Sequence, residues 1–230
     1  MIVANHQPQF LPYLGFFDKL SRADMLVVLD DVQFQERGFQ HRNVIKMQTG
    51  KQWLTVPIKQ RRGQLIKEVQ IDSESNWRKK HWAALVTNYS PAPFFAELSP
   101  GLRDIILNGE QRDLVTLDLD LMRWTMSVLG LSAKLKLSSE LEVAGDANER
   151  HIAICKAVGA DTYLSGPGGK LYMDLAMYES AGVSVQFQDY AHPTYRQLFP
   201  KLEFIPNLAV IDALFNLGPA TRELLGRPQA

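Results

Sequence analysis

A histidine and two glutamines near the N-terminus are the residues best placed for chemistry, in the segment HQPQFLP at residues 6–12. An apolar run at residues 2–4 precedes this segment and a predicted helix follows it. The segment should therefore lie at the carboxyl edge of a sheet, where open α/β folds bind ligands. A histidine, two amides and a helix N-terminus there can hold a phosphate. We predict that Gln7 and Gln9 bind substrate and that His6 is catalytic; a proline-stiffened connection with a solvated histidine is the alternative.

A glycine-rich segment, SGPGGK at residues 165–170, stands between a second predicted strand and helix. Its glycines let the backbone approach a ligand closely, and its N–H groups favour a phosphate or a carboxylate. The segment is not a P-loop, because Leu171 stands where a Ser or Thr would bind magnesium. A tight turn without a ligand is the alternative. The residues predicted to bind phosphate here are Ser165, Gly166, Gly168, Gly169 and Lys170.

Two acidic residues, Asp30 and Asp31, follow a predicted apolar strand at residues 25–29. Carboxylates at a strand end can coordinate a metal ion or bind the hydroxyls of a sugar or ribose. We predict a catalytic role for both, and a solubilising strand end is an equally weighted alternative.

Basic side chains follow, among them Arg37 and Arg42 beside Asn43. If this stretch is helical, Arg37, Arg42 and Lys46 lie near one face. The forked guanidinium of arginine suits a phosphate, so we predict that Arg37, Arg42 and Asn43 bind a phosphate-bearing substrate. A solvated basic face is the alternative.

The elements that would position these residues follow an α/β order. A helix at residues 13–22 joins the apolar runs 2–4 and 25–29, which makes a βαβ unit with parallel strands. Both runs are continuously apolar, as in strands covered on both faces. The last third of the chain returns to this order, so we predict a Rossmann-like, mostly parallel sheet flanked by helices.

Residues 34–80 interrupt the α/β order with eleven Lys and Arg against four acids. They read as a basic insertion that contains a β-hairpin (residues 53–58 and 66–71) and the start of a helix. No linker is evident, so residues 1–230 are predicted to form one domain.

Composition excludes several classes of protein. The chain has 230 residues, 46% of them apolar and 22% charged, which excludes a disordered chain and a coiled coil. Its 25 basic residues balance its 25 acidic ones, so a nucleic-acid partner is not expected. Cys155, the single cysteine, excludes an intramolecular disulfide and suits a reducing compartment. With no targeting segment and no apolar stretch near 20 residues, we expect a cytoplasmic protein without membrane insertion.

Beyond these patterns, the chain resembles the WbqC-like family of bacterial proteins. The resemblance rests on residues 6–19 (HQPQFLPYLGFFDK), Asp24, residues 29–34 (LDDVQF), Arg42 with Asn43, residues 53–57 (WLTVP), residues 77–82 (WRKKHW) with Tyr89, and residues 165–169 (SGPGG) with Tyr172. Members are associated with gene clusters for O-antigen and other surface polysaccharides, and transfer of glycine onto a sugar has been proposed for one. The resemblance implies this context and carries over no catalytic residue.

Together these observations predict a sugar-modifying transferase or ligase of surface-polysaccharide biosynthesis. It would join an amino acid such as glycine to a nucleotide-linked amino sugar, as an aminoacyl transferase or an ATP-dependent ligase. ATP with a divalent metal fits this chemistry, while the sequence specifies neither the metal nor the oligomeric state. The alternative is a non-catalytic ligand-binding or assembly protein encoded with polysaccharide genes, because the tryptophans at positions 53, 77 and 82 suit sugars and partner surfaces.

Overall fold

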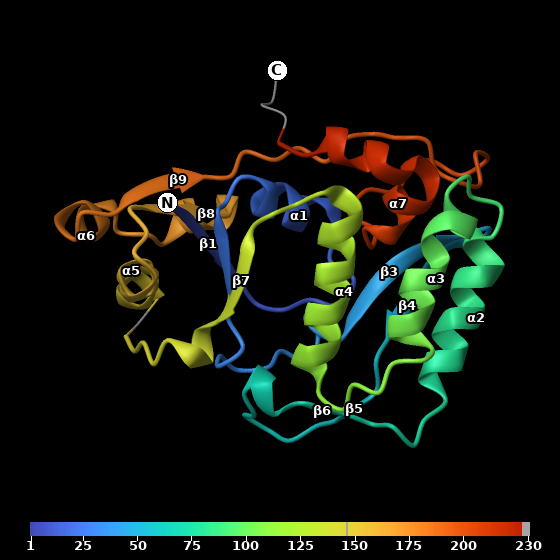
Figure 1. Cartoon of the computed structure of the whole chain (residues 1–230), viewed down its shortest axis with the longest axis horizontal. Coiled ribbons are helices and arrows are strands. Elements are labelled where there is room, and N and C mark those ends of the chain that lie inside the picture. Colours follow the sequence, from blue (N-terminus) through green and yellow to red (C-terminus); the bar gives the residue numbers. More distant parts are fainter. Residues whose placement is uncertain (146, 227–230) are drawn as a thin grey trace.

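A parallel sheet of five strands forms one half of the molecule (Figure 1). The computed structural model describes residues 1–145 and 147–226. The strands, in sheet order, are β7 (Lys134–Leu137), β2 (Met25–Val28), β1 (Ile2–His6), β8 (Thr162–Ser165) and β9 (Ser184–Phe187). In chain order these strands are the third, second, first, fourth and fifth of the sheet, as in Rossmann-type folds. The predicted α/β class is therefore confirmed.

Helices cover both faces of this sheet, which explains why its central strands are continuously apolar. Helix α1 (Leu14–Ser21) packs on the face that carries Ala4 and Leu26. Helices α5 (Ala147–Val158) and α6 (Leu175–Ser180) pack on the opposite face, against Val3 and Val27. Side chains alternate between the faces along a strand, so His6 points to the same face as Ala4.

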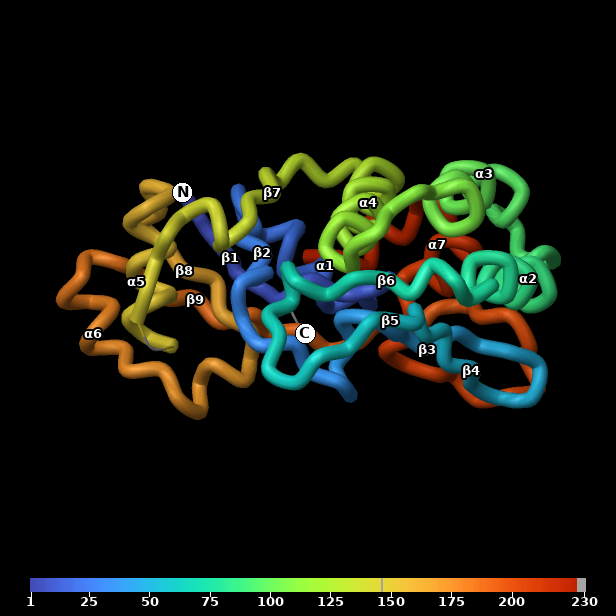
Figure 2. The backbone as a smooth tube through the Cα atoms, turned by 90° about the horizontal axis from the view of Figure 1, so that it is seen from below, coloured from blue at the N-terminus to red at the C-terminus, as the bar shows by residue number. Residues whose placement is uncertain are grey.

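The main hairpin of the basic insertion, β3 (Arg42–Met47) with β4 (Gly50–Thr55), lies at the other end of the molecule from α5 and α6, as Figures 1 and 2 both show. Residues 66 and 67 of the insertion form hydrogen bonds back to the backbone after β2. A short second pair joins β5 (Ile58–Lys59) to β6 (Gln70–Ile71). The predicted hairpin is thus present only as the β5–β6 pair. The predicted helical face for Arg37, Arg42 and Lys46 is wrong, because Arg42 and Lys46 belong to strand β3.

Four helices pack beside the insertion. They are α2 (Trp77–Tyr89), α3 (Phe95–Ile106), α4 (Leu114–Leu129) and α7 (Ile211–Leu217). Asp113 caps α4 by accepting a hydrogen bond from the Thr116 N–H at 2.8 Å, and Gly130 ends the helix with φ 61°. Among the described residues, no helix is both long and apolar enough to cross a membrane.

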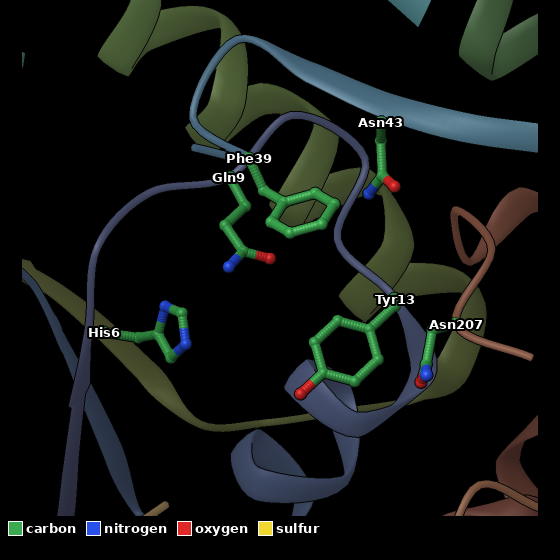
Figure 3. Close-up of a pocket in the computed structure, with 6 residues that line it drawn as sticks. All are labelled: His6, Gln9, Tyr13, Phe39, Asn43 and Asn207. Atoms are coloured by element: carbon green, nitrogen blue, oxygen red, sulfur yellow. The ribbon is translucent and has the colours of Figure 1, made fainter. Parts of the chain in front are cut away.

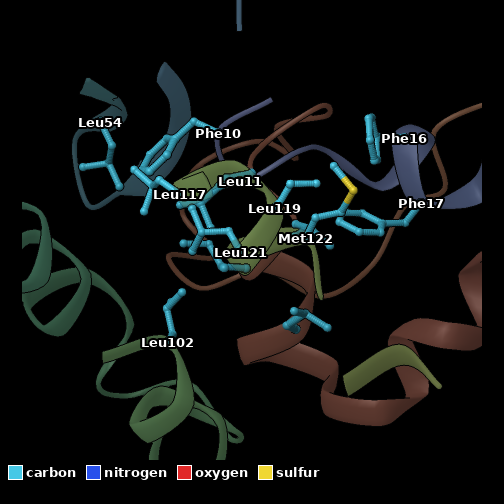
Figure 4. Close-up of a cluster of buried hydrophobic side chains, with 14 of the residues drawn as sticks. Phe10, Leu11, Phe16, Phe17, Leu54, Leu102, Leu117, Leu119, Leu121 and Met122 are labelled. Atoms are coloured by element: carbon cyan, nitrogen blue, oxygen red, sulfur yellow. The ribbon is translucent and has the colours of Figure 1, made fainter. Parts of the chain in front are cut away.

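One apolar core runs from the sheet into the insertion and the helices. It contains Ala4 and Leu26 of the sheet, Leu54 of β4 and Leu117 of α4. Phe10, from the loop after β1, lies between Leu54 and Leu117 in Figure 4 and is fully buried. The polar loop after β1 is therefore anchored by its own apolar side chains.

Candidate functional site

A cavity of about 360 Å³ opens beside the carboxyl end of β1 (Figure 3). Its lining residues are His6, Gln9, Tyr13, Phe39, Asn43 and Asn207. Strand order in the sheet reverses between β1 and β8, and Rossmann-type sheets bind their ligands at this reversal, outside the carboxyl ends of the strands. Ala4 pairs with Leu164, so the residues after Leu164 begin at the edge where His6 ends. The fold therefore brings the His6 segment and the glycine segment to one edge of the sheet.

His6 enters the cavity as a neutral base. Its Nδ1 lies 2.9 Å from the carbonyl oxygen of Gln7, and because a carbonyl only accepts, Nδ1 carries the proton and Nε2 holds the lone pair. Burial lowers the pKa of His6 to about 4, and the charge of Lys19 adds to this effect. In Figure 3 the imidazole points into the cavity, toward the phenol of Tyr13. At neutral pH His6 can accept a proton.

Two further polar groups of the cavity wall can bind a ligand. Gln9 Oε1 is buried and has no hydrogen-bond partner among the residues that the structure describes. Leaving a buried acceptor unpaired costs about 1–3 kcal/mol, which a bound ligand or water would offset. Burial raises the pKa of Tyr13, with a contribution from the charge of Asp18, so its phenol remains a donor.

Gln7 and Asn43 hold the loop that carries these groups. Gln7 Oε1 accepts a hydrogen bond from Gln40 Nε2 at 2.7 Å. Asn43 Nδ2 donates to the carbonyl oxygens of Leu11, at 2.7 Å, and Phe10, at 3.2 Å. The loop needs this support because Leu11 has φ 47°, in the left-handed region. The structure thus gives Gln7 and Asn43 positioning contacts, and substrate binding by either stays a prediction.

Asp30 and Asp31 lie at the same sheet edge, on the β7 side. Asp30 is buried and accepts hydrogen bonds from the Ser139 N–H, at 3.0 Å, and Ser139 Oγ, at 2.6 Å. Asp31 pairs with Arg150 at 2.5 Å and accepts from Ser138 Oγ. Burial raises the pKa of Asp31, but the hydrogen bonds from Ser138 and Arg150 outweigh burial and leave that pKa below its ordinary value.

These contacts tie the end of β2 to β7 and α5, and a catalytic role for the two aspartates stays a prediction. Within residues 1–145 and 147–226, no three His, Cys, Asp or Glu side chains gather as a metal site.

The glycine segment forms a short 3-10 helix at Pro167–Leu171. Its three glycines differ in how much space a side chain would find at each position. A Cβ at Gly169 would lie 2.0 Å from Ser165 Oγ and 2.8 Å from Met173 Sδ, so a larger residue there would force these side chains to move. A Cβ at Gly166 or Gly168 would meet no atom within 4 Å, and neither glycine has a positive φ. Internal packing therefore explains only one of the three glycines. The other two leave open space over the backbone, as a closely approaching ligand would require.

Of the three predicted phosphate-binding cations, Lys170 belongs to the glycine segment, and none lines the His6 cavity. Arg37 is exposed. Arg42 donates from Nη2 to the Arg37 carbonyl at 2.6 Å, and its guanidinium carbon lies 4.6 Å from the ring centre of Trp53. Lys170 is exposed, with Nζ 5.6 Å from the ring centre of Phe187. Phosphate binding by these three residues remains a prediction.

Sequence reasoning missed four residues of the site. Tyr13 read only as the start of a helix. Phe39 and Asn207 belong to loops without periodicity, so no local signal marks them. Lys19 is buried in α1 and donates to the Asn5 carbonyl at 2.9 Å; burial lowers its pKa to about 8. The sequence did carry a signal for Lys19: it lies among the apolar residues of a short helix, which indicates a buried lysine.

Comparison with known proteins agrees with the resemblance noted above. The model of the WbqC-like protein family matches residues 7–224. A protein of Mycobacterium tuberculosis, "Uncharacterized protein Rv1507c", is 35% identical over 226 residues, which cover 97% of this chain and 96% of the relative. No solved structure matches the chain. The match over nearly the whole length shows that the chain belongs to the WbqC-like protein family.

Proposed function

We propose that the chain is an enzyme of surface-polysaccharide biosynthesis that transfers an acyl group, such as a glycyl group, onto the amine of a nucleotide-linked sugar. The observation that carries this proposal is a neutral His6 in the wall of a cavity at the point where the strand order reverses. The glycine segment begins at the same sheet edge, and no side chain covers the backbone of Gly166 and Gly168. The family association with polysaccharide gene clusters supplies the substrate class.

His6 would act as the general base of the transfer. The sugar amine attacks the carbonyl carbon of an activated acyl donor and forms the new C–N bond. The bond to the leaving group breaks and its electron pair departs with that group. For an acyl adenylate the leaving group is AMP; the adenylate itself forms when the glycine carboxylate attacks the α-phosphorus of ATP and pyrophosphate leaves. The proton lost by the amine goes to Nε2 of His6, which holds the free lone pair because Nδ1 donates to Gln7.

The glycine segment would receive the phosphates of the nucleotide. Gly166 and Gly168 offer backbone without covering side chains, and the exposed Lys170 offers a positive charge beside them. Charge-assisted hydrogen bonds to phosphate oxygens are roughly twice as strong as neutral ones, so even a shallow exposed segment can hold a diphosphate.

Product formation tests the proposal directly. The full chain is incubated with ATP, glycine and UDP-glucosamine, and the mixture is analysed by mass spectrometry. We expect a glycylated nucleotide sugar together with AMP. Absence of both products, across nucleotide amino sugars and with Mg²⁺ supplied, would contradict the transferase role. Binding without turnover would instead favour the alternative, a non-catalytic ligand-binding protein of the same gene clusters.

A further inference from the structure

Among the residues that the structure describes, the wall of the His6 cavity carries no charged side chain: its six lining residues include no Asp, Glu, Lys or Arg. The amide of Asn43 is committed to backbone carbonyls, which leaves His6, Gln9, Tyr13 and Asn207 as hydrogen-bonding groups. Moving an anion into such a wall without a countercharge is costly. The cavity therefore suits an uncharged, polar part of a ligand, and the phosphates must lie outside it.

One side of this cavity is an exposed aromatic ring. Phe39 is 47% exposed although large apolar side chains are usually covered. Its ring centre lies 6.0 Å from that of Trp53, with an angle of 32° between the rings, and the guanidinium of Arg42 lies over Trp53. The Phe39 carbonyl accepts a hydrogen bond from the Phe10 N–H at 3.0 Å. Ring and backbone are thus both held in place at the cavity.

Polar groups from separate parts of the chain surround the face of Phe39. Gln9 and Tyr13 come from the loop after β1, and Asn207 comes from the segment before α7. In Figure 3 Gln9 lies beside Phe39, and Tyr13 and Asn207 lie together across the space from His6. A sugar ring has one apolar face that stacks on an aromatic ring and hydroxyls around its perimeter. A nucleobase can also stack on an aromatic ring, so UDP without a sugar is the necessary comparison.

We propose that this cavity is the sugar subsite, in which a pyranose ring stacks on Phe39 and its hydroxyls bind Gln9, Tyr13 and Asn207. The inference rests on the proposed function for the identity of the ligand. His6 lines this subsite, and the glycine segment begins at the same sheet edge, so an amine on the sugar would lie within reach of His6 while the phosphates extend toward Gly166.

The experiment compares three probes by calorimetry: UDP-glucosamine, glucosamine 1-phosphate and UDP. The variants are Phe39→Ala, which removes the ring, and Phe39→Tyr, which keeps it. Phe39→Ala removes the stacking ring and the apolar area it buries, so it should weaken binding of both sugar-bearing probes about tenfold. Affinity for UDP should stay within about twofold, and Phe39→Tyr should bind all three probes almost as the unsubstituted chain does.

Two outcomes would overturn the subsite. If Phe39→Ala weakens UDP as much as UDP-glucosamine, Phe39 stacks on the base instead. If Phe39→Ala leaves every affinity unchanged, or if the unsubstituted chain binds none of the probes, no sugar stacks on Phe39.

Other outcomes separate the subsite from the proposed function. Phe39-dependent binding of UDP-glucosamine without product supports the subsite and contradicts the transferase. Phe39-dependent binding of glucosamine 1-phosphate, without any binding of the two nucleotides, supports the subsite and contradicts the nucleotide linkage.

Discussion

Replacing His6 by asparagine separates the structural contact of this residue from its proposed chemistry. The amide nitrogen of asparagine can take the place of Nδ1 and keep the hydrogen bond to the Gln7 carbonyl, which is 2.9 Å long. The variant loses Nε2 and the edge contact with Phe16, whose ring centre lies 5.0 Å away. His6 is half-buried and its hydrogen bond is kept, so we expect the free energy of unfolding to change by about 1 kcal/mol at most.

The loss of turnover in His6→Asn should be much larger. A positioned general base contributes about 10²- to 10⁴-fold, so acyl transfer should slow at least a hundredfold, or roughly 2.7 kcal/mol. Affinity for UDP-glucosamine should change little, because asparagine and a neutral imidazole are both small and uncharged. Burial lowers the pKa of His6 to about 4, so protonation of His6 should reduce kcat/KM only as the pH approaches 4, below the earlier fall that protonation of the sugar amine itself causes.

Mass-spectrometric product rates and urea unfolding measure the two effects. The control is Leu26→Ala, which removes a buried side chain of β2 and should cost about 2–5 kcal/mol of stability while the folded fraction keeps its turnover. Turnover by His6→Asn at the unsubstituted rate would refute the general base. A loss of stability as large as that of Leu26→Ala would show that His6 is a core residue.

Four further substitutions test other parts of the structure. Gly168→Ala should change the free energy of unfolding by about 1 kcal/mol at most and weaken UDP binding. Gly169→Ala should destabilise the fold, because its Cβ would lie 2.0 Å from Ser165 Oγ. Thermal shifts with and without UDP separate the loss of binding from the loss of stability. The free energy of unfolding should fall as the pH drops from about 6.5 toward 4, because burial lowers the pKa of His81 to about 4 and the unfolded chain takes up that proton first; His81→Gln should make the fall shallower in urea titrations. Asp118 is fully buried and both of its carboxylate oxygens are without a partner among the described residues, so Asp118→Leu should stabilise the chain at pH 7 by about 1 kcal/mol or more in the same assay.

The sheet was predictable because its strands depend on local signals. Continuous apolar runs mark β1 and β2, and Gly130 marks the end of α4. Strand β3 was not predictable from its own residues, because its buried Lys46 reads as a surface residue. Lys46 Nζ donates to Gln197 Oε1 at 3.0 Å, a partner far along the chain, and this tertiary contact decides the burial.

Two residues whose side chains could do chemistry are part of the core. His81 is buried against Trp77, with ring centres 5.1 Å apart. Cys155 is fully buried in α5, and burial raises the pKa of its thiol to about 11, as expected for a core residue that is not a nucleophile.

Only part of the candidate site was predictable from the sequence. Local sequence patterns locate the His6 segment, whereas the residues that face it depend on tertiary contacts. The position of His6 follows from where a strand ends. Phe39 and Asn207 reach the cavity through long-range packing, and neither a loop composition nor a residue spacing reveals such contacts. The sequence therefore located a reactive group and left the surface facing it undetermined.

That missing surface explains what the basic insertion contributes. A parallel sheet with helices supplies His6 and the open glycines, but it has no wall opposite its carboxyl edge. Phe39 and Asn43 of the insertion provide that wall, and the Asn43 hydrogen bonds to the backbone of Leu11 fix the loop after β1 against it. Most of the insertion's positive charge lies outside the uncharged cavity. In the proposed enzyme, the insertion therefore selects an uncharged ring, and the charge of the ligand is held elsewhere along the sheet edge.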